Sequence, residues 1–315
     1  QVLVTNGGKQ AVYQAFQTVV DDGDDVLLPA PYWTTYPEAI RLAGGNPVEV
    51  FAGADQEYKV TPEQLEAAYT EHTKALLFCS PSNPTGAVYS REVLQKIVNI
   101  AREHNLLILA DEIYDRILYD GAQHISIASL APDLLTITFN GLSKAYRVCG
   151  YRAGWLVITG PRRRATGFIE GLDLLAGTRL CSNVPGQHAI QVALGGYQSI
   201  NELIEPGGRL HEQRGIAWEK LNSIPGVSCV RPMGALYVYP RLDPDVHEIH
   251  DDRQFALDLL EQERILVTQG TGFNWPTPDH LRIVTLPWAR DLAGLPGGGG
   301  RWQEWCSPKC SQTTG

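Results

Sequence analysis

The sequence predicts an α/β protein in which a mostly parallel sheet is flanked by helices and followed by a smaller α+β C-terminal domain. Through residues 1–200, short unbroken apolar runs alternate with longer segments in which apolar residues recur every three or four positions. After about residue 200, two strand-like runs follow one another before the next helical segment. We therefore predict a large domain at 1–200, a small domain at 201–291 and a separate tail at 292–315.

Each expected element follows from a local pattern. Apolar runs that end at turn residues predict strands at 2–5, 26–28, 75–79, 106–109, 134–139 and 155–158, and in the small domain at 227–230, 235–239 and 281–286. Helical periodicity predicts helices at 9–20, 210–221 and about 255–260. Two more helices start at recognisable caps. Thr61, Pro62 and Gln64 are the cap, first-turn proline and third residue of one, and Ser90 caps the other.

Composition limits the class of function. The formal net charge of −9 argues against nucleic acid or an anionic membrane as a partner, because both favour clustered Lys and Arg. No apolar run approaches the roughly 20 residues that span a bilayer. Four of the six cysteines, Cys79, Cys149, Cys181 and Cys229, are scattered, as reduced thiols of a cytoplasmic protein would be. Cys306 and Cys310 lack the further ligands of a zinc site, so we predict no metal.

Both ends of the chain are unusual. Gln1 lies directly before the apolar run 2–4, and we expect that an N-terminal segment of the large domain is missing. From about Leu292 the sequence loses helical and strand periodicity and contains four consecutive glycines, 297–300. We expect an aberrant, disordered tail there, such as a shifted reading frame would produce.

Polar residues follow several predicted strands, where an open α/β sheet binds ligands. The turn after strand 2–5 contains Gly7, Gly8 and Lys9, and two glycines before a helix start suit a phosphate. Asn83 stands between two prolines after strand 75–79, and Asp111 follows four apolar residues. Taken singly, these are most simply a turn, a rigid loop and an exposed acid.

The remaining candidates lie further along the chain. Ser143 and Lys144 follow strand 134–139, Arg152 comes eight residues later, and Arg282 lies on strand 281–286 between two apolar residues. Each alone would be interpreted as a surface charge. Their joint order with Asn83 and the Asp111 to Tyr114 segment is the informative feature.

This order resembles that of the class I and II aminotransferases, which have the fold-type I architecture and depend on pyridoxal 5′-phosphate. The resemblance extends from Gln1 to about Asp291, and its most specific parts are 80–86 and 143–155. Within the family the chain looks most similar to bacterial alanine (glutamate–pyruvate) and aspartate aminotransferases. The resemblance implies a homodimer, with small amino acids and 2-oxo acids as substrates.

The resemblance also implies roles for the candidates. Lys144 would bind the cofactor covalently and move the substrate proton, Asp111 would pair with the ring nitrogen, and Asn83 and Tyr114 would bond the phenolic oxygen. Trp33 would stack on the ring. Gly7, Gly8, Lys9, Ser143 and Arg152 would hold the phosphate, and Arg282, with Asn83, would bind the substrate carboxylate.

Two departures from the family pattern matter. Gly141 stands where many members have a phosphate-binding serine three residues before the lysine, so a backbone group or Ser143 must serve instead. No residue matches the N-terminal segment that covers the substrate in the family, or the tyrosine that reaches the partner's phosphate.

The reaction has alternatives. We predict amino-group exchange between alanine and 2-oxoglutarate, with aspartate transamination, another reaction of the same cofactor such as a β-lyase or decarboxylase, and an inactive fragment as the other possibilities. A binding module of a transcription regulator is less consistent with the acidic charge and with Arg282. Arg179 is either a second carboxylate ligand or a surface arginine.

Overall fold

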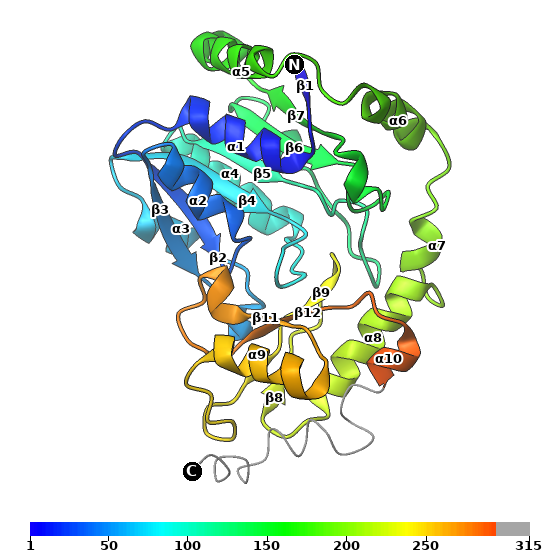
Figure 1. The fold of residues 1–315 in the computed structure, drawn as a ribbon. Helices are drawn as coiled ribbons and strands as arrows, with labels where there is room; N and C mark the ends of the chain where they lie inside the picture. The colour runs from blue at the N-terminus through cyan, green and yellow to red at the C-terminus, as the bar shows by residue number, and fades with distance from the viewer. Residues whose placement is uncertain (294–315) are drawn as a thin grey trace.

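The computed structural model describes residues 1–293, which form a large sheet covered by helices and a smaller C-terminal unit beneath it in Figure 1. Within these residues, no helix has both the length and the apolar character needed to cross a membrane. Of the predicted tail, residues 294–315, with Cys306 and Cys310, lie outside the described part of the chain.

The large sheet has seven strands in the order β1-β7-β6-β5-β4-β2-β3. The strands are β1 (Val2–Thr5), β2 (Asp25–Ala30), β3 (Asn46–Phe51), β4 (Thr73–Cys79), β5 (Leu107–Asp111), β6 (Thr136–Gly141) and β7 (Gly154–Thr159). The pairings from β3 to β6 are parallel, and β7 runs antiparallel to both β6 and β1. The prediction of a mostly parallel sheet is confirmed.

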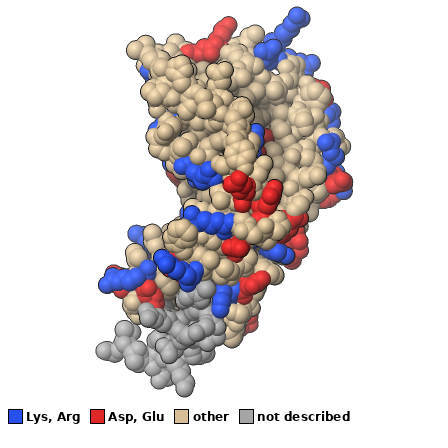
Figure 2. Space-filling model, turned by 90° about the vertical axis from the view of Figure 1, so that its right-hand side faces the viewer, with Lys and Arg blue, Asp and Glu red and all other residues tan. Residues whose placement is uncertain are grey.

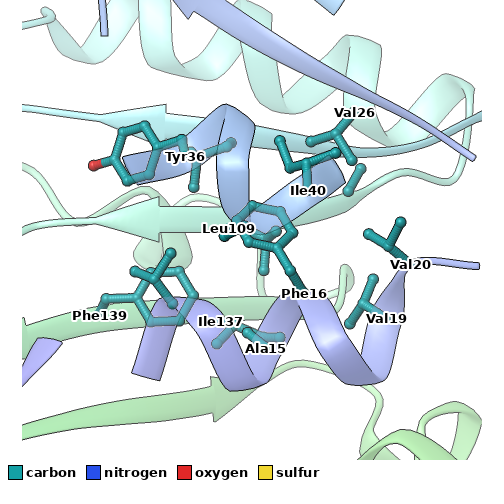
Figure 3. Packing of buried hydrophobic residues seen from close by; sticks show 14 of the residues in the cluster. Ala15, Phe16, Val19, Val20, Val26, Tyr36, Ile40, Leu109, Ile137 and Phe139 are labelled. Carbon is teal, nitrogen blue, oxygen red and sulfur yellow. The ribbon is translucent and has the colours of Figure 1, made fainter. Parts of the chain in front are cut away.

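Helices bury both faces of this sheet, because neighbouring strand residues point to opposite sides. On one face, α1 (Gly8–Val19), α2 (Thr35–Leu42) and α5 (Thr166–Thr178) pack on the strands. Figure 3 shows Phe16 of α1 and Ile40 of α2 directed at Leu109 of β5. On the other face, α3 (Pro62–Ala68) and α4 (Arg91–Glu103) enclose a second core.

Local sequence sets where the helices start. The predicted capping box at Thr61 and Gln64 is present, since each side chain accepts a hydrogen bond from the other residue's backbone. Ser90 likewise caps α4 through the backbone N–H of Val93. Helix α2 and strand β3 were not predicted, because α2 has only eight residues and β3 is half exposed and contains a proline.

The C-terminal unit contains short antiparallel strands and three helices around its own core. It comprises α8 (Arg209–Asn222), β8 (Val227–Ser228), β9 (Tyr237–Val238), β10 (Arg241–Leu242), α9 (Asp252–Glu263), β11 (Thr268–Gln269), β12 (Leu281–Val284) and α10 (Ala289–Ala293). One sheet has the order β11-β12-β9, and β8 pairs with β10. Helices α6 (Val184–Gly195) and α7 (Asn201–Ile204) precede this unit. The α+β character agrees with the prediction, and the domain boundary at residue 200 stays a prediction.

Candidate active site

A cavity of about 360 Å³ lies at the carboxyl ends of the parallel strands, between the large sheet and the C-terminal unit. Its size falls within the roughly 300–1,000 Å³ of small-molecule sites. Ten of the eleven predicted site residues line this one cavity: Gly8, Lys9, Trp33, Asn83, Asp111, Tyr114, Ser143, Lys144, Arg152 and Arg282. Gly7, the eleventh, lies next to Gly8 and against Arg152. The structure therefore brings together residues from both ends of the chain.

Asp111 is the last residue of β5 and is buried, with 7% of its surface exposed. One carboxylate oxygen accepts a hydrogen bond from the hydroxyl of Tyr36 at 2.6 Å, and the other accepts one from the backbone N–H of Ile113 at 3.1 Å. Burial raises the pKa of Asp111, and the Tyr36 bond and the Lys144 ammonium act against this rise. A buried carboxylate with few charged neighbours favours a cationic ligand group as its partner.

Lys144 and Tyr114 face one another in the cavity. The Lys144 ammonium lies 5.6 Å from the centre of the Tyr114 ring. Tyr114 follows β5 by three residues and is buried, and its hydroxyl lies 2.7 Å from that of Tyr237 on β9. Burial is the main cause that raises the pKa of Tyr114 well above its usual value, and the neighbouring Tyr237 raises it further. The Tyr114 hydroxyl therefore remains a proton donor.

Arg282 projects from β12 into the same cavity. Its guanidinium donates to the Asn83 side-chain oxygen at 3.0 Å and to the Thr268 hydroxyl at 3.3 Å. The buried Nε has no hydrogen-bond partner within the described part of the chain. A buried guanidinium donor without a partner costs free energy, so Arg282 is prepared for an anionic ligand.

The turn after β1 lies against Arg152. Gly7 has φ 84° and ψ 164°, a conformation that essentially only glycine adopts, and a Cβ atom on Gly7 would overlap the Arg152 guanidinium. Arg152 donates to the carbonyl of Cys149 at 2.6 Å and to that of Asn6 at 3.4 Å. Helix α1 begins at Gly8, so its free N–H groups and Arg152 form one anion-binding corner. Lys9 lies 5.1 Å above the Trp33 ring.

We expect Gly7→Ala to weaken phosphate binding and Gly8→Ala to leave it nearly unchanged. The Gly7 backbone would be strained by about 1–3 kcal/mol and Arg152 displaced. Within the described part of the chain, an added Cβ on Gly8 would meet no atom within 4 Å outside its chain neighbours and its own helix backbone. Titration of both variants with pyridoxal phosphate, followed by absorbance, checks this. Equal affinities would show that the turn does not hold the phosphate.

The structure explains the departure at Gly141. This residue pairs with Gly154 across β6 and β7, and a Cβ atom at 141 would lie 2.9 Å from the carbonyl oxygen of Ala153. A serine side chain therefore has no room in this arrangement. Ser143 does line the cavity, as predicted for a substitute phosphate ligand.

Arg179 does not reach the cavity of its own chain. It caps α5, and its guanidinium donates to the carbonyls of Val4 and Leu180. It lines a separate, open hollow near α6. Its predicted role as a second carboxylate ligand receives no support from these contacts.

Seven residues that line the cavity were not predicted as site residues: Tyr36, Cys79, Ile113, Phe139, Asn140, Cys149 and Tyr237. Tyr36 comes from the unpredicted helix α2, and its ring is fully buried beside Asp111. Cys79 ends β4 opposite Asp111 in the sheet, and burial raises the pKa of its thiol to about 12. The place of Cys79 at the end of the predicted strand 75–79 could have indicated it. The three-residue spacing of Trp33 and Tyr36, about one helical turn, could have indicated that their rings lie close together.

This fold and this constellation of side chains define an enzyme of the fold-type I class. Residues 1–288 match the family described as aminotransferase class I and II. An alanine aminotransferase from Mycobacterium tuberculosis is 62% identical over 292 residues, which cover 93% of this chain and 68% of that protein. The glutamate–pyruvate aminotransferase AlaA of Escherichia coli is 55% identical over 291 residues, which cover 92% of this chain and 72% of that protein.

Solved structures agree. An aminotransferase from Escherichia coli superposes with a TM-score of 0.91 at 55% identity, covering 92% of this chain and 72% of that one. An alanine aminotransferase from Pyrococcus furiosus gives a TM-score of 0.88 at 33% identity, covering 97% and 76%. This chain belongs to the aminotransferase class I and II family, and it is an aminotransferase. Members of this family use pyridoxal phosphate.

Proposed function

We propose that this chain binds pyridoxal phosphate through Lys144 and exchanges amino groups between alanine and 2-oxoglutarate. The observation that carries the proposal is the single cavity that joins Lys144, Asp111, Arg152 and Arg282. The donor set fits the cofactor. An anion-binding corner, a buried carboxylate and a lysine match its phosphate, its ring nitrogen and its aldehyde.

The bound cofactor supplies an electron-withdrawing ring, and the chain's residues hold that ring and the substrate. Asp111 would keep the ring nitrogen protonated, and Tyr36 and the backbone of Ile113 hold the carboxylate in place. Asn83 and Tyr114 would bond the phenolic oxygen, and Trp33 would stack on the ring. Gly7, Gly8, Lys9, Ser143 and Arg152 would hold the phosphate.

Arg282 orients the substrate and Lys144 moves its proton. The guanidinium of Arg282 binds the α-carboxylate, beside the Asn83 amide that it already contacts. This contact fixes the substrate so that its Cα–H bond lies within reach of the Lys144 amine, and the fixed geometry accelerates proton transfer.

The names of similar proteins support alanine. The relatives at 62% and 55% identity are named for alanine and for glutamate–pyruvate exchange. A relative named aspartate aminotransferase, from Streptomyces avermitilis, is 43% identical.

Product analysis tests this function. The chain is loaded with pyridoxal phosphate and supplied with 2-oxoglutarate and either alanine or aspartate. We expect glutamate and pyruvate to form in equal amounts, with alanine preferred over aspartate. Preference for aspartate would overturn the substrate assignment. Ammonia or carbon dioxide in place of glutamate would indicate a lyase or decarboxylase.

We further propose that the chain forms a homodimer through the region of α5 and α6. Large apolar side chains are exposed there: Leu174, Leu180, Val184, Val192, Leu194 and Tyr197. Figure 2 shows few charged residues over the upper part of the face that contains α6. Exposed apolar surface of this kind favours association with a second copy. The predicted cytoplasmic location stays a prediction.

Val192→Asp is expected to shift the chain from dimer to monomer, because a charge in an apolar interface is costly to desolvate. Light scattering after size-exclusion chromatography measures the mass. Leu257→Asp is the matched control, since Leu257 is also exposed but lies on α9. A monomeric parent chain would contradict the proposal.

A further inference from the structure

Tyr237 occupies a position between two residues that the proposed function uses. It lies on β9, is 7% exposed, and lines the cavity. Its hydroxyl lies 2.7 Å from the hydroxyl of Tyr114, and its ring lies 4.6 Å below the Arg282 guanidinium. One side chain of the C-terminal unit thus contacts a residue of the cofactor side and a residue of the substrate side.

The hydroxyl contact determines where the Tyr114 proton can go. A tyrosine hydroxyl has one proton to donate and two lone pairs that accept. In the Tyr114–Tyr237 pair, one hydroxyl must donate to the other. Tyr114 can donate to a ligand in the cavity only when Tyr237 is the donor of the pair. A hydroxyl that accepts a hydrogen bond also becomes a stronger donor itself.

The ring contact determines where the Arg282 guanidinium lies. A guanidinium is attracted to the face of an aromatic ring, and the attraction grows where water is excluded. Arg282 lies on β12, whose Val284 pairs with Tyr237 across the sheet. The Phe273 ring, 4.7 Å away, provides a second aromatic contact. Together the two rings hold the guanidinium, whose Nε has no hydrogen-bond partner among residues 1–293.

We propose that Tyr237 is a positioning residue with two separable actions: its hydroxyl orients the Tyr114 proton toward the cofactor, and its ring holds Arg282 toward the substrate carboxylate. This inference rests on the proposed function. The two actions belong to different atoms of one side chain, so different substitutions remove them. Tyr237→Phe removes only the hydroxyl, and Tyr237→Leu removes the ring as well.

Tyr119 provides the matched control. It is 1% exposed, its hydroxyl donates to the carbonyl of Ala235 at 2.9 Å, and its ring lies 4.9 Å from the Arg214 guanidinium. Tyr119 therefore has the same kinds of contact as Tyr237, but it is not among the residues that line the cavity. Tyr119→Phe reproduces the loss of a buried hydroxyl without touching the site.

The cofactor-side action is measured by titrating the absorbance of the chain loaded with pyridoxal phosphate against pH. Tyr237→Phe is expected to raise the midpoint by about 0.4–1 pH unit, because a weaker donor stabilises the deprotonated chromophore less. Tyr114→Phe should raise it at least as far. Tyr119→Phe should leave the midpoint where it is in the parent chain.

The substrate-side action is measured as the dissociation constant of 2-methylalanine, which lacks the Cα–H bond and so binds without being converted. Tyr237→Leu is expected to weaken its binding by about 3- to 30-fold, as the loss of a buried cation–ring contact predicts. Tyr237→Phe, which keeps a ring, should stay within about twofold of the parent.

The outcomes separate this inference from the proposed function. A parent chain that takes up no pyridoxal phosphate overturns both. A loaded parent in which Tyr237→Phe and Tyr119→Phe have the same midpoint overturns the hydroxyl action alone. Equal binding of 2-methylalanine by Tyr237→Leu and Tyr237→Phe overturns the ring action. If the leucine variant does not fold, Tyr237→Met, with a flexible apolar side chain of similar length, replaces it.

Discussion

Replacing Lys144 with alanine is expected to abolish covalent attachment of pyridoxal phosphate and to lower amino-group exchange by at least about 10²–10⁴-fold, because the substrate proton loses its carrier. Reduction of the loaded parent chain with borohydride should fix the cofactor on the peptide that contains Lys144, as mass spectrometry can show. The same treatment of Lys144→Ala should fix none.

Lys74→Ala is the control for this experiment. Lys74 is a partly exposed lysine that pairs with Asp21 and Asp24 at the opposite end of its strand from Cys79, so its loss should change neither labelling nor exchange. Cofactor fixed on any other lysine of the parent chain would remove the central assignment of the site.

Replacing Asp111 with asparagine is expected to lower the rate of exchange by about 10²–10³-fold, the size of effect seen when a preorganised electrostatic contact is removed. Asparagine keeps the size of the side chain and an oxygen that can accept from Tyr36, but it has no negative charge to keep the ring nitrogen protonated. The affinity for pyridoxal phosphate should fall as well. Stopped-flow kinetics and absorbance titration measure the two effects.

Glu112→Gln is the matched control for Asp111→Asn. Glu112 is the next residue and is equally buried, but its carboxylate contacts His124 and the Ile127 backbone N–H, and it does not line the cavity. Losing that charge should destabilise the fold without slowing the chemistry of the folded fraction. Equal rate losses in the two variants would mean that Asp111 acts through the fold alone.

The local sequence was sufficient to predict the positions of most strands in the large sheet. Continuous apolar runs placed β4, β5, β6 and β7 to within two or three residues, because a strand buried on both faces is mostly apolar. The helix caps at Thr61 and Ser90 could also be predicted from the sequence, since a cap depends only on residues three positions apart.

The same patterns could not provide strand direction or order. β7 runs antiparallel to its neighbours although its apolar run resembles the others. The short elements α2 and β3 carry too few residues for a period to show. In the C-terminal unit, β9 is two residues long, and its predicted span was longer, because pairing partners and not apolar character decide where a short strand ends.

By itself, the sequence determined the chemical inventory of this aminotransferase: a glycine turn before a helix, an acid at a strand end, a lysine followed by an arginine, and a late arginine. These features are local, so their order along the chain is enough to show them. Only the tertiary structure decided that Tyr36 bonds Asp111 across 75 residues and that Tyr237 meets Tyr114 across 123. Such contacts depend on which strand ends are neighbours in space, and the spacing of residues along the chain does not determine which strand ends these are.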